Sequence, residues 1–189
     1  MENKSTFERF KGHFKKITRH KILVTVMCIK CGMIAQGLKH DLSKYSIVEF
    51  KAGVKYYQGF RSPIDAEKED LGYSLGWLHH KGVNKHHWEY WIDKNYGNYD
   101  LYVLDIPFNY LLESVIDRIC ASKNYNPNYS DESPLQFFDY GKDKHFMGKE
   151  NCRRVRLLLE YLAKNGEKEA IKYYRLLYKN WKKDHKFNI

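Results

Sequence analysis

The adjacent residues His40 and Asp41 are the pair in this chain best suited to bind a metal ion. A lone His-Asp dipeptide is more often a solvated surface pair, but the context here favours a metal site. His20 lies upstream on an apolar helix face, and Asp117 lies on a later helix with an apolar neighbouring face. If these side chains are buried they need partners, and one divalent ion would satisfy all four.

The ligand types restrict which ion would bind. Two imidazoles and two carboxylates offer mixed nitrogen and oxygen ligation, which suits Mn, Fe, Co, Ni or Zn better than Ca. The sequence therefore predicts a divalent transition metal held by His20, His40, Asp41 and Asp117.

A second region gathers four histidines within nine residues: His79, His80, His86 and His87. Histidine is the commonest metal ligand, so we expect His80 and His87 to bind a second ion or to contact phosphate. The alternative is a polar histidine turn on the surface. The sequence leaves open which member of each adjacent pair points inward. We expect one ion and leave a second open.

These residues need helices to bring them together, and the dominant period of the sequence is helical. Steps of three and four predict one buried helix face made of His20, Val24, Met27, Cys31, Ile34 and Leu38. Pro107 is predicted to start another helix, with a buried stripe of Leu112, Val115, Ile116 and Ile119. Glu113 and Asp117 lie one turn apart on the adjoining face of that helix.

The rest of the pattern predicts an all-α, single-domain helical bundle of about seven to eight helices over residues 1–189. Ser46 starts one helix, and Ser62-Pro63 starts another that leads to His80. Two helices close the chain, with Gly166 between them. We find no alternating strand and expect a loop at residues 95–105. The metal-site core would span residues 15–125, with the helices of residues 149–184 packed on it.

The composition is that of an ordinary globular protein, with 43% hydrophobic and 30% charged residues. The net charge of +10 indicates anionic partners. The longest apolar run, Ile22 to Ile29, is too short to cross a bilayer, and the first ten residues do not resemble a signal peptide. We expect a cytoplasmic protein with no membrane partner. The C-x-x-C pair Cys28 and Cys31 has no second pair, so we interpret it as part of the core.

Three segments carry a family resemblance: His20, then Leu38-Lys-His40-Asp41-Leu-Ser-Lys44, then Ile116-Asp117-Arg118. Together they resemble the H…HD…D signature of the HD-domain metal-dependent phosphohydrolases, over roughly residues 15–125. The resemblance implies an all-helical fold, with the four ligands on three helices, and hydrolysis of phosphoesters, often in nucleotides. The whole chain also resembles a bacterial and phage family of unknown function.

The resemblance also suggests roles for other side chains. Lys44 stands where many members have a lysine after the His-Asp pair, and it could equally bind phosphate or form a surface ion pair. Arg61 and Arg118 are further candidates for phosphate binding, and Arg118 could equally be a structural partner. The glycine that commonly precedes the lysine is absent.

The catalytic residues that we expect are Asp41 and a general acid. Some nucleotidases of the superfamily have an acidic residue at the position before the lysine, and this chain has none there. Glu49, Glu89 and Glu113 therefore remain as candidates for the general acid. Glu113 is favoured because it precedes Asp117 by one helical turn on the same face.

Three functions remain open at this stage. The first is a phosphohydrolase that acts on a nucleotide or another small phosphoester. The second is a di-iron oxygenase, because some HD-like proteins with additional histidines activate dioxygen. The third is a nucleic-acid-binding or regulatory module with a structural or absent metal, whose contact surface would be the basic aromatic segment from Tyr173 to Lys186.

Overall fold

The computed structural model of the protein describes residues 5–141 and 145–184. Within these residues the chain forms eight α-helices, two 3-10 helices and one two-stranded sheet, which confirms the predicted all-α bundle. The elements are α1 (Thr6–Lys30), α2 (Ile34–Lys39), η1 (Leu42–Tyr45), α3 (Ile47–Lys55), α4 (Pro63–Leu71), α5 (Leu75–Val83), η2 (Trp88–Trp91), β1 (Ile92–Lys94), β2 (Leu101–Val103), α6 (Phe108–Tyr125), α7 (Ser133–Tyr140) and α8 (Lys149–Asp184).

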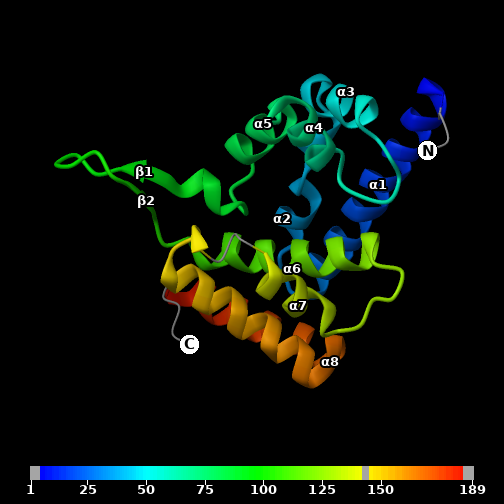
Figure 1. Ribbon diagram of the computed structural model, residues 1–189. Coiled ribbons are helices and arrows are strands. Elements are labelled where there is room, and N and C mark those ends of the chain that lie inside the picture. The colour runs from blue at the N-terminus through cyan, green and yellow to red at the C-terminus, as the bar shows by residue number, and fades with distance from the viewer. Residues whose placement is uncertain (1–4, 142–144, 185–189) are drawn as a thin grey trace.

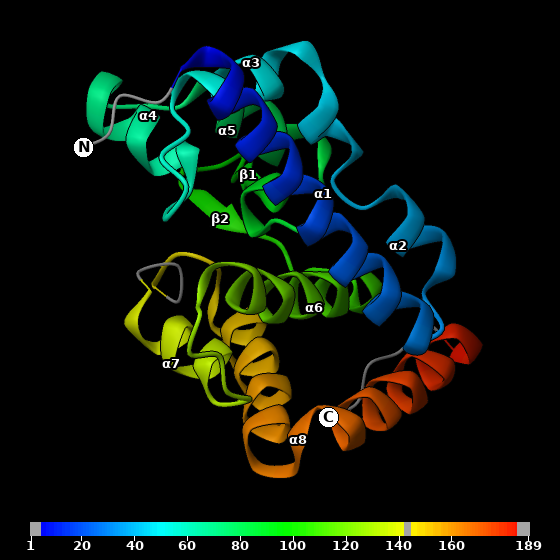
Figure 2. The same cartoon turned by 90° about the vertical axis from the view of Figure 1, so that its right-hand side faces the viewer.

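The helices form two groups on either side of α6. Figure 1 shows α3, α4 and α5 above α6, and α7 and α8 below it. Helix α1 passes from the first group to the second, with α2 alongside it (Figure 2). Strands β1 and β2 form an antiparallel hairpin that projects away from the helices (Figure 1). Helix α1 therefore contacts both groups, through α3 in the first and α8 in the second.

The main core lies between α1, α6 and α8. Its fully buried members include Val24, Leu112, Val115, Ile116, Ile119, Leu158, Leu159, Leu162 and Tyr174. Helix α1 begins with a capping box, in which the Ser5 hydroxyl accepts a hydrogen bond from the Glu8 amide and the Glu8 carboxylate accepts one from the Ser5 amide. The helix that positions His20 is thus fixed at its first turn and along its core face.

A close crossing of α1 and α2 brings the His40-Asp41 segment next to His20. A Cβ atom at Gly37 would lie 2.6 Å from Cβ of Cys28, so only glycine allows this approach. Thr25 donates a hydrogen bond to the Gly37 carbonyl, and the Lys21 ammonium donates to the carbonyls of Leu38 and His40. Polar side chains of α1 therefore satisfy the carbonyl end of α2.

Two segments that we predicted as single helices each form two helices in the structure. The helix predicted over residues 20–38 divides at Gly32, whose φ of +86° ends α1. Ile34 and Leu38, which we predicted to be buried, are each 56% exposed. The helix predicted from Ser62 to His80 also divides, because Gly72 has a φ of +79° and Ser74 then caps α5.

The loop predicted at residues 95–105 was also partly wrong. It contains β2, whose Leu101–Val103 pairs with Ile92–Lys94 of β1. Strands of three residues are too short to show the alternation on which a prediction from sequence depends.

The division predicted at Gly166 is confirmed. Gly166 has a φ of +78° and a ψ of +163°, which separates α8 into two helical halves. Figure 2 shows the halves meeting at an angle at the lower edge of the molecule. Among the described residues, none of the helices combines the length and apolar character needed to cross a membrane.

Candidate metal centre

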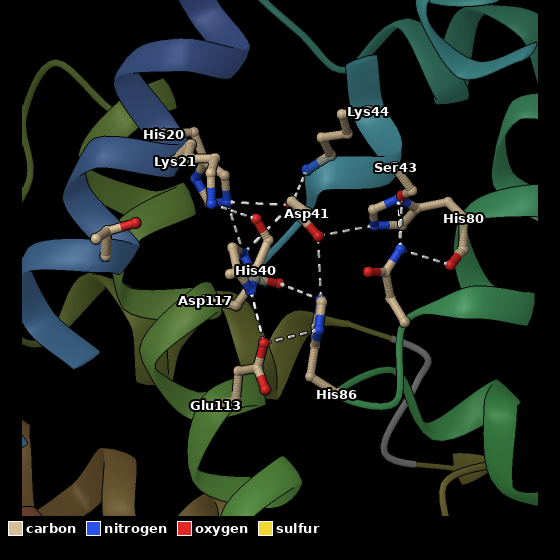
Figure 3. A network of polar contacts seen from close by, with 12 residues as sticks. His20, Lys21, His40, Asp41, Ser43, Lys44, His80, His86, Glu113 and Asp117 are labelled. Atoms are coloured by element: carbon tan, nitrogen blue, oxygen red, sulfur yellow. Dashed lines mark hydrogen bonds and ion pairs between the residues drawn. The ribbon is translucent and has the colours of Figure 1, made fainter. Parts of the chain in front are cut away.

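The four residues predicted to surround a metal ion lie together in the structure (Figure 3). Nε2 of His20 is 2.8 Å from Oδ1 of Asp117, and Nε2 of His40 is 3.3 Å from Oδ2 of Asp41. Nε2 of His40 also lies 3.5 Å from Oδ1 of Asp117. Bonds of about 2.1 Å to one ion place neighbouring ligand atoms about 3.0–3.4 Å apart. The separations therefore suit a shared ion, and this group is the first ligand set.

A second set of potential ligands meets the other side of Asp41. Its Oδ1 atom lies 3.3 Å from Nε2 of His80 and 3.4 Å from Nε2 of His86. His87 completes the group, whose ligand atoms all lie within 4.8 Å of one another. Oδ2 of Asp41 faces the first ligand set, so one carboxylate connects the two sets.

The backbone at Asp41 explains how one residue can reach both sides. Asp41 has a φ of +53°, in the left-handed region that aspartate tolerates better than most residues. It lies between the end of α2 and the start of η1, and it is 1% exposed. Unusual backbone angles at non-glycine residues are often found at functional sites.

The two adjacent histidine pairs, 79–80 and 86–87, differ in how many of their side chains reach the cluster. In the first pair it is His80 that approaches Asp41, whereas His79 lies at the rim with its side chain 34% exposed. In the second pair both His86 and His87 join the cluster. Sequence reasoning named His87 and missed His86. The two residues follow α5 in a turn rather than in a helix, so helical periodicity cannot sort them.

Glu113 lies behind two of the imidazoles. Its Oε1 atom accepts a hydrogen bond from Nδ1 of His40 at 2.9 Å and lies 3.3 Å from Nδ1 of His86. Gln36 donates to the other oxygen at 2.9 Å. Carboxylates in this position fix the tautomer and the orientation of metal-binding histidines. The geometry thus gives Glu113 a positioning role.

The ionisation of Glu113 argues against the general-acid role favoured from the sequence. Burial alone would raise the pKa of this carboxyl, but hydrogen bonds from His40 and His86 outweigh burial and lower the pKa to about 2. A carboxylate that is ionised at neutral pH has no proton to donate. The i, i+4 spacing to Asp117 could not reveal that the side chain is occupied by two imidazoles.

Glu49 contacts Nδ1 of His80 in the same way that Glu113 contacts Nδ1 of His40. Its Oε2 atom lies 2.7 Å from Nδ1 of His80, and its Oε1 atom lies 2.6 Å from Nδ1 of His79. A proton on Nδ1 of His80, donated to Glu49, leaves Nε2 as a free electron-pair donor facing Asp41. Burial would raise the pKa of Glu49, but its hydrogen bonds with the two histidines lower it.

The cluster leaves potential ligand atoms unsatisfied. The buried atoms without a suitably aligned hydrogen bond include Nε2 of His20, His40, His86 and His87, and Oδ1 of Asp41. Nε2 of His20 and Oδ1 of Asp117, although 2.8 Å apart, are therefore two potential metal-ligand atoms that point toward the same position. Each unsatisfied buried group costs about 1–3 kcal/mol, which a bound cation would offset. Within the described residues, the buried His, Asp and Glu side chains could hold a metal ion.

Lys44 joins the cluster from its solvent side. Its Nζ atom lies 2.5 Å from Oδ2 of Asp41, and its side chain is 26% exposed. Burial would raise the pKa of Asp41, but the positive charges of His40 and Lys44 hold it well below its usual range. Lys44 is thus the predicted phosphate-binding residue that the structure brings to the centre.

The other two predicted phosphate-binding residues make contacts elsewhere. Arg118 follows Asp117 by one position and so points to a different side of α6, where its guanidinium lies over the Phe138 ring at 5.5 Å. Arg61 lies between α3 and α4 and pairs with both carboxylate oxygens of Glu69, at 2.6 and 2.5 Å. These contacts favour structural roles for both arginines.

The C-x-x-C pair belongs to the hydrophobic core, as we interpreted it. Cys28 and Cys31 are fully buried, at the end of α1 and at its C-cap. Burial raises the pKa of Cys31 to about 12, which keeps the thiol protonated. Among the described residues, the candidate ligand groups contain no cysteine.

The aromatic residues of the segment predicted to bind nucleic acid are used in packing. Tyr174 is fully buried, Tyr173 stacks on Tyr161 with ring centroids 4.2 Å apart, and Tyr178 stacks on Trp181. Tyr174 is therefore closed to bases, and the other three rings are partly buried. Lys186 lies outside the described residues.

Comparison with known proteins identifies the family of the chain. Residues 9–165 match the family of unknown function DUF5662. The chain belongs to this family. The match to DUF5662 contains every residue of both ligand sets, together with Lys44, Glu49 and Glu113. No curated protein and no solved structure matches the chain significantly.

Proposed function

We propose that the protein is a metal-dependent phosphohydrolase with a centre for two divalent transition-metal ions, which share Asp41. The observation that carries this proposal is the division of the Asp41 carboxylate, because Oδ2 faces His40 while Oδ1 faces His80 and His86. Two-ion sites are common in enzymes that hydrolyse phosphoesters. The proposal is consistent with the resemblance of the His20, His40-Asp41 and Asp117 segments to HD-domain proteins.

The ligand chemistry supports transition metals such as Mn, Fe, Co, Ni or Zn. Five imidazoles and two carboxylates give a nitrogen-rich site, which suits these ions better than Ca or Mg. His20, His40 and Asp117 would hold one ion and His80, His86 and His87 the other. Such ions supply a water of lowered pKa and offset negative charge on a phosphoryl group.

The side chains around the centre have distinct roles in this proposal. Glu113 and Glu49 keep Nδ1 of their histidine partners protonated, so Nε2 stays available as a ligand. Lys44 offers a partly exposed ammonium beside Asp41, and it would exchange that contact for a phosphoryl oxygen of the substrate. The net charge of +10 would attract a small anionic substrate such as a nucleotide.

The test combines metal analysis with a screen of phosphoester substrates. The purified protein should carry about two equivalents of transition metal, and it should release phosphate or nucleoside from at least one phosphomonoester or nucleotide. Asp41→Asn should lose metal and activity together. Asp93→Asn, which changes an exposed aspartate on β1, is the matched control and should lose neither. A metal-loaded protein that hydrolyses none of the esters would contradict the proposal.

The same ligand set suits a second candidate function, a di-iron oxygenase. Its specific support is the number of histidines, because two sets rich in imidazole that share one carboxylate also match the ligands of non-haem iron. Purification under anaerobic conditions would separate the two functions. A coloured protein with two irons that consumes dioxygen would favour the oxygenase, whereas a colourless Mn, Ni or Zn protein that hydrolyses phosphoesters would exclude it.

A further inference from the structure

The N-terminal half of α1, the end of η1 and the start of α3 expose apolar side chains on one surface. We call this surface the aromatic face and define it by Phe7, Phe10, Phe14, Tyr45 and Ile47. Phe7 is 64% exposed and Ile47 is 85% exposed, and the other three are between 37% and 47% exposed. Helices α1 and α3 lie side by side at the end of α1 that bears these residues (Figure 2).

Contacts between the rings show that Phe10, Phe14 and Tyr45 of the aromatic face form one group. Phe10 and Phe14 stack with centroids 6.5 Å apart, and Phe14 meets Tyr45 at 6.1 Å. Phe50 of α3 lies against both phenylalanines, at 5.3 Å from Phe10 and 6.5 Å from Phe14. Ile47 precedes Phe50 by three residues and therefore projects from the same side of α3.

Such a face is unusual for a surface with no partner. Single exposed apolar side chains are common on globular proteins, but contiguous apolar patches mark sites of association. The fold does not require these side chains at the surface, because α1 buries a different face that includes His13 and Ile17. The aromatic face thus calls for a partner that covers it.

The charges around the aromatic face indicate the kind of partner. Lys11, Lys15 and Lys51 are exposed beside it, and Nζ of Lys11 lies 4.1 Å from the centre of the Phe7 ring. Glu8 is the sole acidic residue of α1, and the sole acidic residue of α3, Glu49, is buried. A second copy of the chain would bring these lysines against its own, which is unfavourable. An anionic surface would instead pair with them.

We propose, in place of our expectation of no membrane partner, that the aromatic face docks on the surface of a membrane that contains anionic phospholipids. Phe7 and Ile47 insert among the lipid headgroups, and the three lysines pair with anionic headgroups. A helix with large apolar side chains beside lysines is the usual device for binding at the lipid–water interface without crossing the bilayer. This inference concerns a surface outside the metal centre and does not depend on the proposed reaction.

Vesicle flotation with the full-length, metal-loaded protein tests the proposal. The protein should bind vesicles with about 30% phosphatidylserine and should bind pure phosphatidylcholine vesicles at least tenfold more weakly. Phe7→Ser/Ile47→Ser should weaken binding to the anionic vesicles more than tenfold. Both side chains are mostly in solvent, so the folded core is kept. The matched control is Phe137→Ser/Leu176→Ser, which removes apolar side chains 73% and 54% exposed on α7 and α8.

A second pair of variants separates docking from general attraction between opposite charges. Lys11→Gln/Lys51→Gln should weaken binding about tenfold or more, whereas Lys168→Gln/Lys182→Gln on α8 removes the same charge and should weaken it only slightly. Equal losses in the two pairs would overturn the proposal. The absence of binding to either kind of vesicle would also overturn it, as would a stable dimer that Phe7→Ser/Ile47→Ser dissociates.

Discussion

Glu113 and His40 are joined by a buried hydrogen bond of 2.9 Å between Oε1 and Nδ1. The Glu113 carboxylate favours a proton on Nδ1, and the opposite nitrogen of His40 faces Asp41 and Asp117, where it would become a ligand on binding a cation. The ligand atoms of the centre are therefore arranged by a second layer of carboxylates. Several consequences of this arrangement can be measured.

Glu113→Gln should weaken metal binding while the fold is retained. The amide keeps the size of the side chain but loses the charge that orients His40 and His86, and changes of this kind cost about 10- to 100-fold in metal affinity. Competition with a chromogenic chelator would measure the affinity. Glu160→Gln, at an exposed ion pair with Arg156, is the control and should bind metal like the wild type. Unchanged affinity in Glu113→Gln would contradict the positioning role.

Variants of the two ligand sets should differ in stoichiometry. His20→Ala affects the first set alone and His80→Ala the second set alone, so each should retain about one tightly bound ion. Asp41→Ala removes the shared ligand and should lose both ions. Elemental analysis after dialysis would measure the metal content, with the exposed His145→Ala as control. Complete loss of metal in both single histidine variants would indicate one ion rather than two.

The close crossing of α1 and α2 predicts that alanine at Gly37 and alanine at Gly82 change the free energy of unfolding in opposite directions. Gly37→Ala would place a Cβ atom 2.6 Å from Cβ of Cys28, so overpacking should lower the free energy of unfolding by about 1–3 kcal/mol. Gly82→Ala near the end of α5 meets no atom within 4 Å and should raise it by up to about 1 kcal/mol. Urea denaturation would measure both. A neutral effect of Gly37→Ala would show that α2 can move away from α1.

Long helices with a regular apolar period could be predicted from the sequence. The helix after Pro107 and the division of the last helix at Gly166 are both confirmed. The break at Gly32 was missed because the apolar spacing continues from Met27 to Ile34 through the turn. Periodicity records which residues are apolar, and a short turn between two helices that cross closely does not interrupt it.

At the site, too, the sequence predicts residues in a distinctive pattern but not orientations that depend on tertiary contacts. Residues next to a distinctive pattern, such as His40 and Asp41, could be chosen from the sequence. That His86 joins the site together with His87 could not be predicted, because both lie in a turn held by tertiary contacts such as the hydrogen bond from the Asn84 side chain to the His80 carbonyl. The contacts of Arg61 and Arg118 with Glu69 and Phe138 likewise depend on tertiary structure. Residue type alone does not show where a cation will find its partner.

The stability of the metal-free protein should fall in acid, in part because of Glu113. Its pKa is lowered from 4.5 to about 2 in the folded state, so the folded state binds this proton less readily than the unfolded state. The resulting stabilisation, up to about 3 kcal/mol, is complete above the pKa of the unfolded chain and is lost as the pH falls from about 5 toward 2. Chelated wild type should therefore lose stability steeply over this interval in urea denaturation, and Glu113→Gln should show a smaller slope.

Glu150 provides the control for this pH dependence, because its pKa is also lowered to about 2 but the side chain lies at the surface beside Arg153 and Arg154. Solvent and salt screen such a pair, so Glu150→Gln should leave the slope of stability against pH nearly unchanged at high ionic strength. Glu113 is shielded from salt by burial, and its contribution should persist under the same conditions. Equal slopes for wild type and Glu113→Gln would show that the ionised carboxylate does not stabilise the folded cluster.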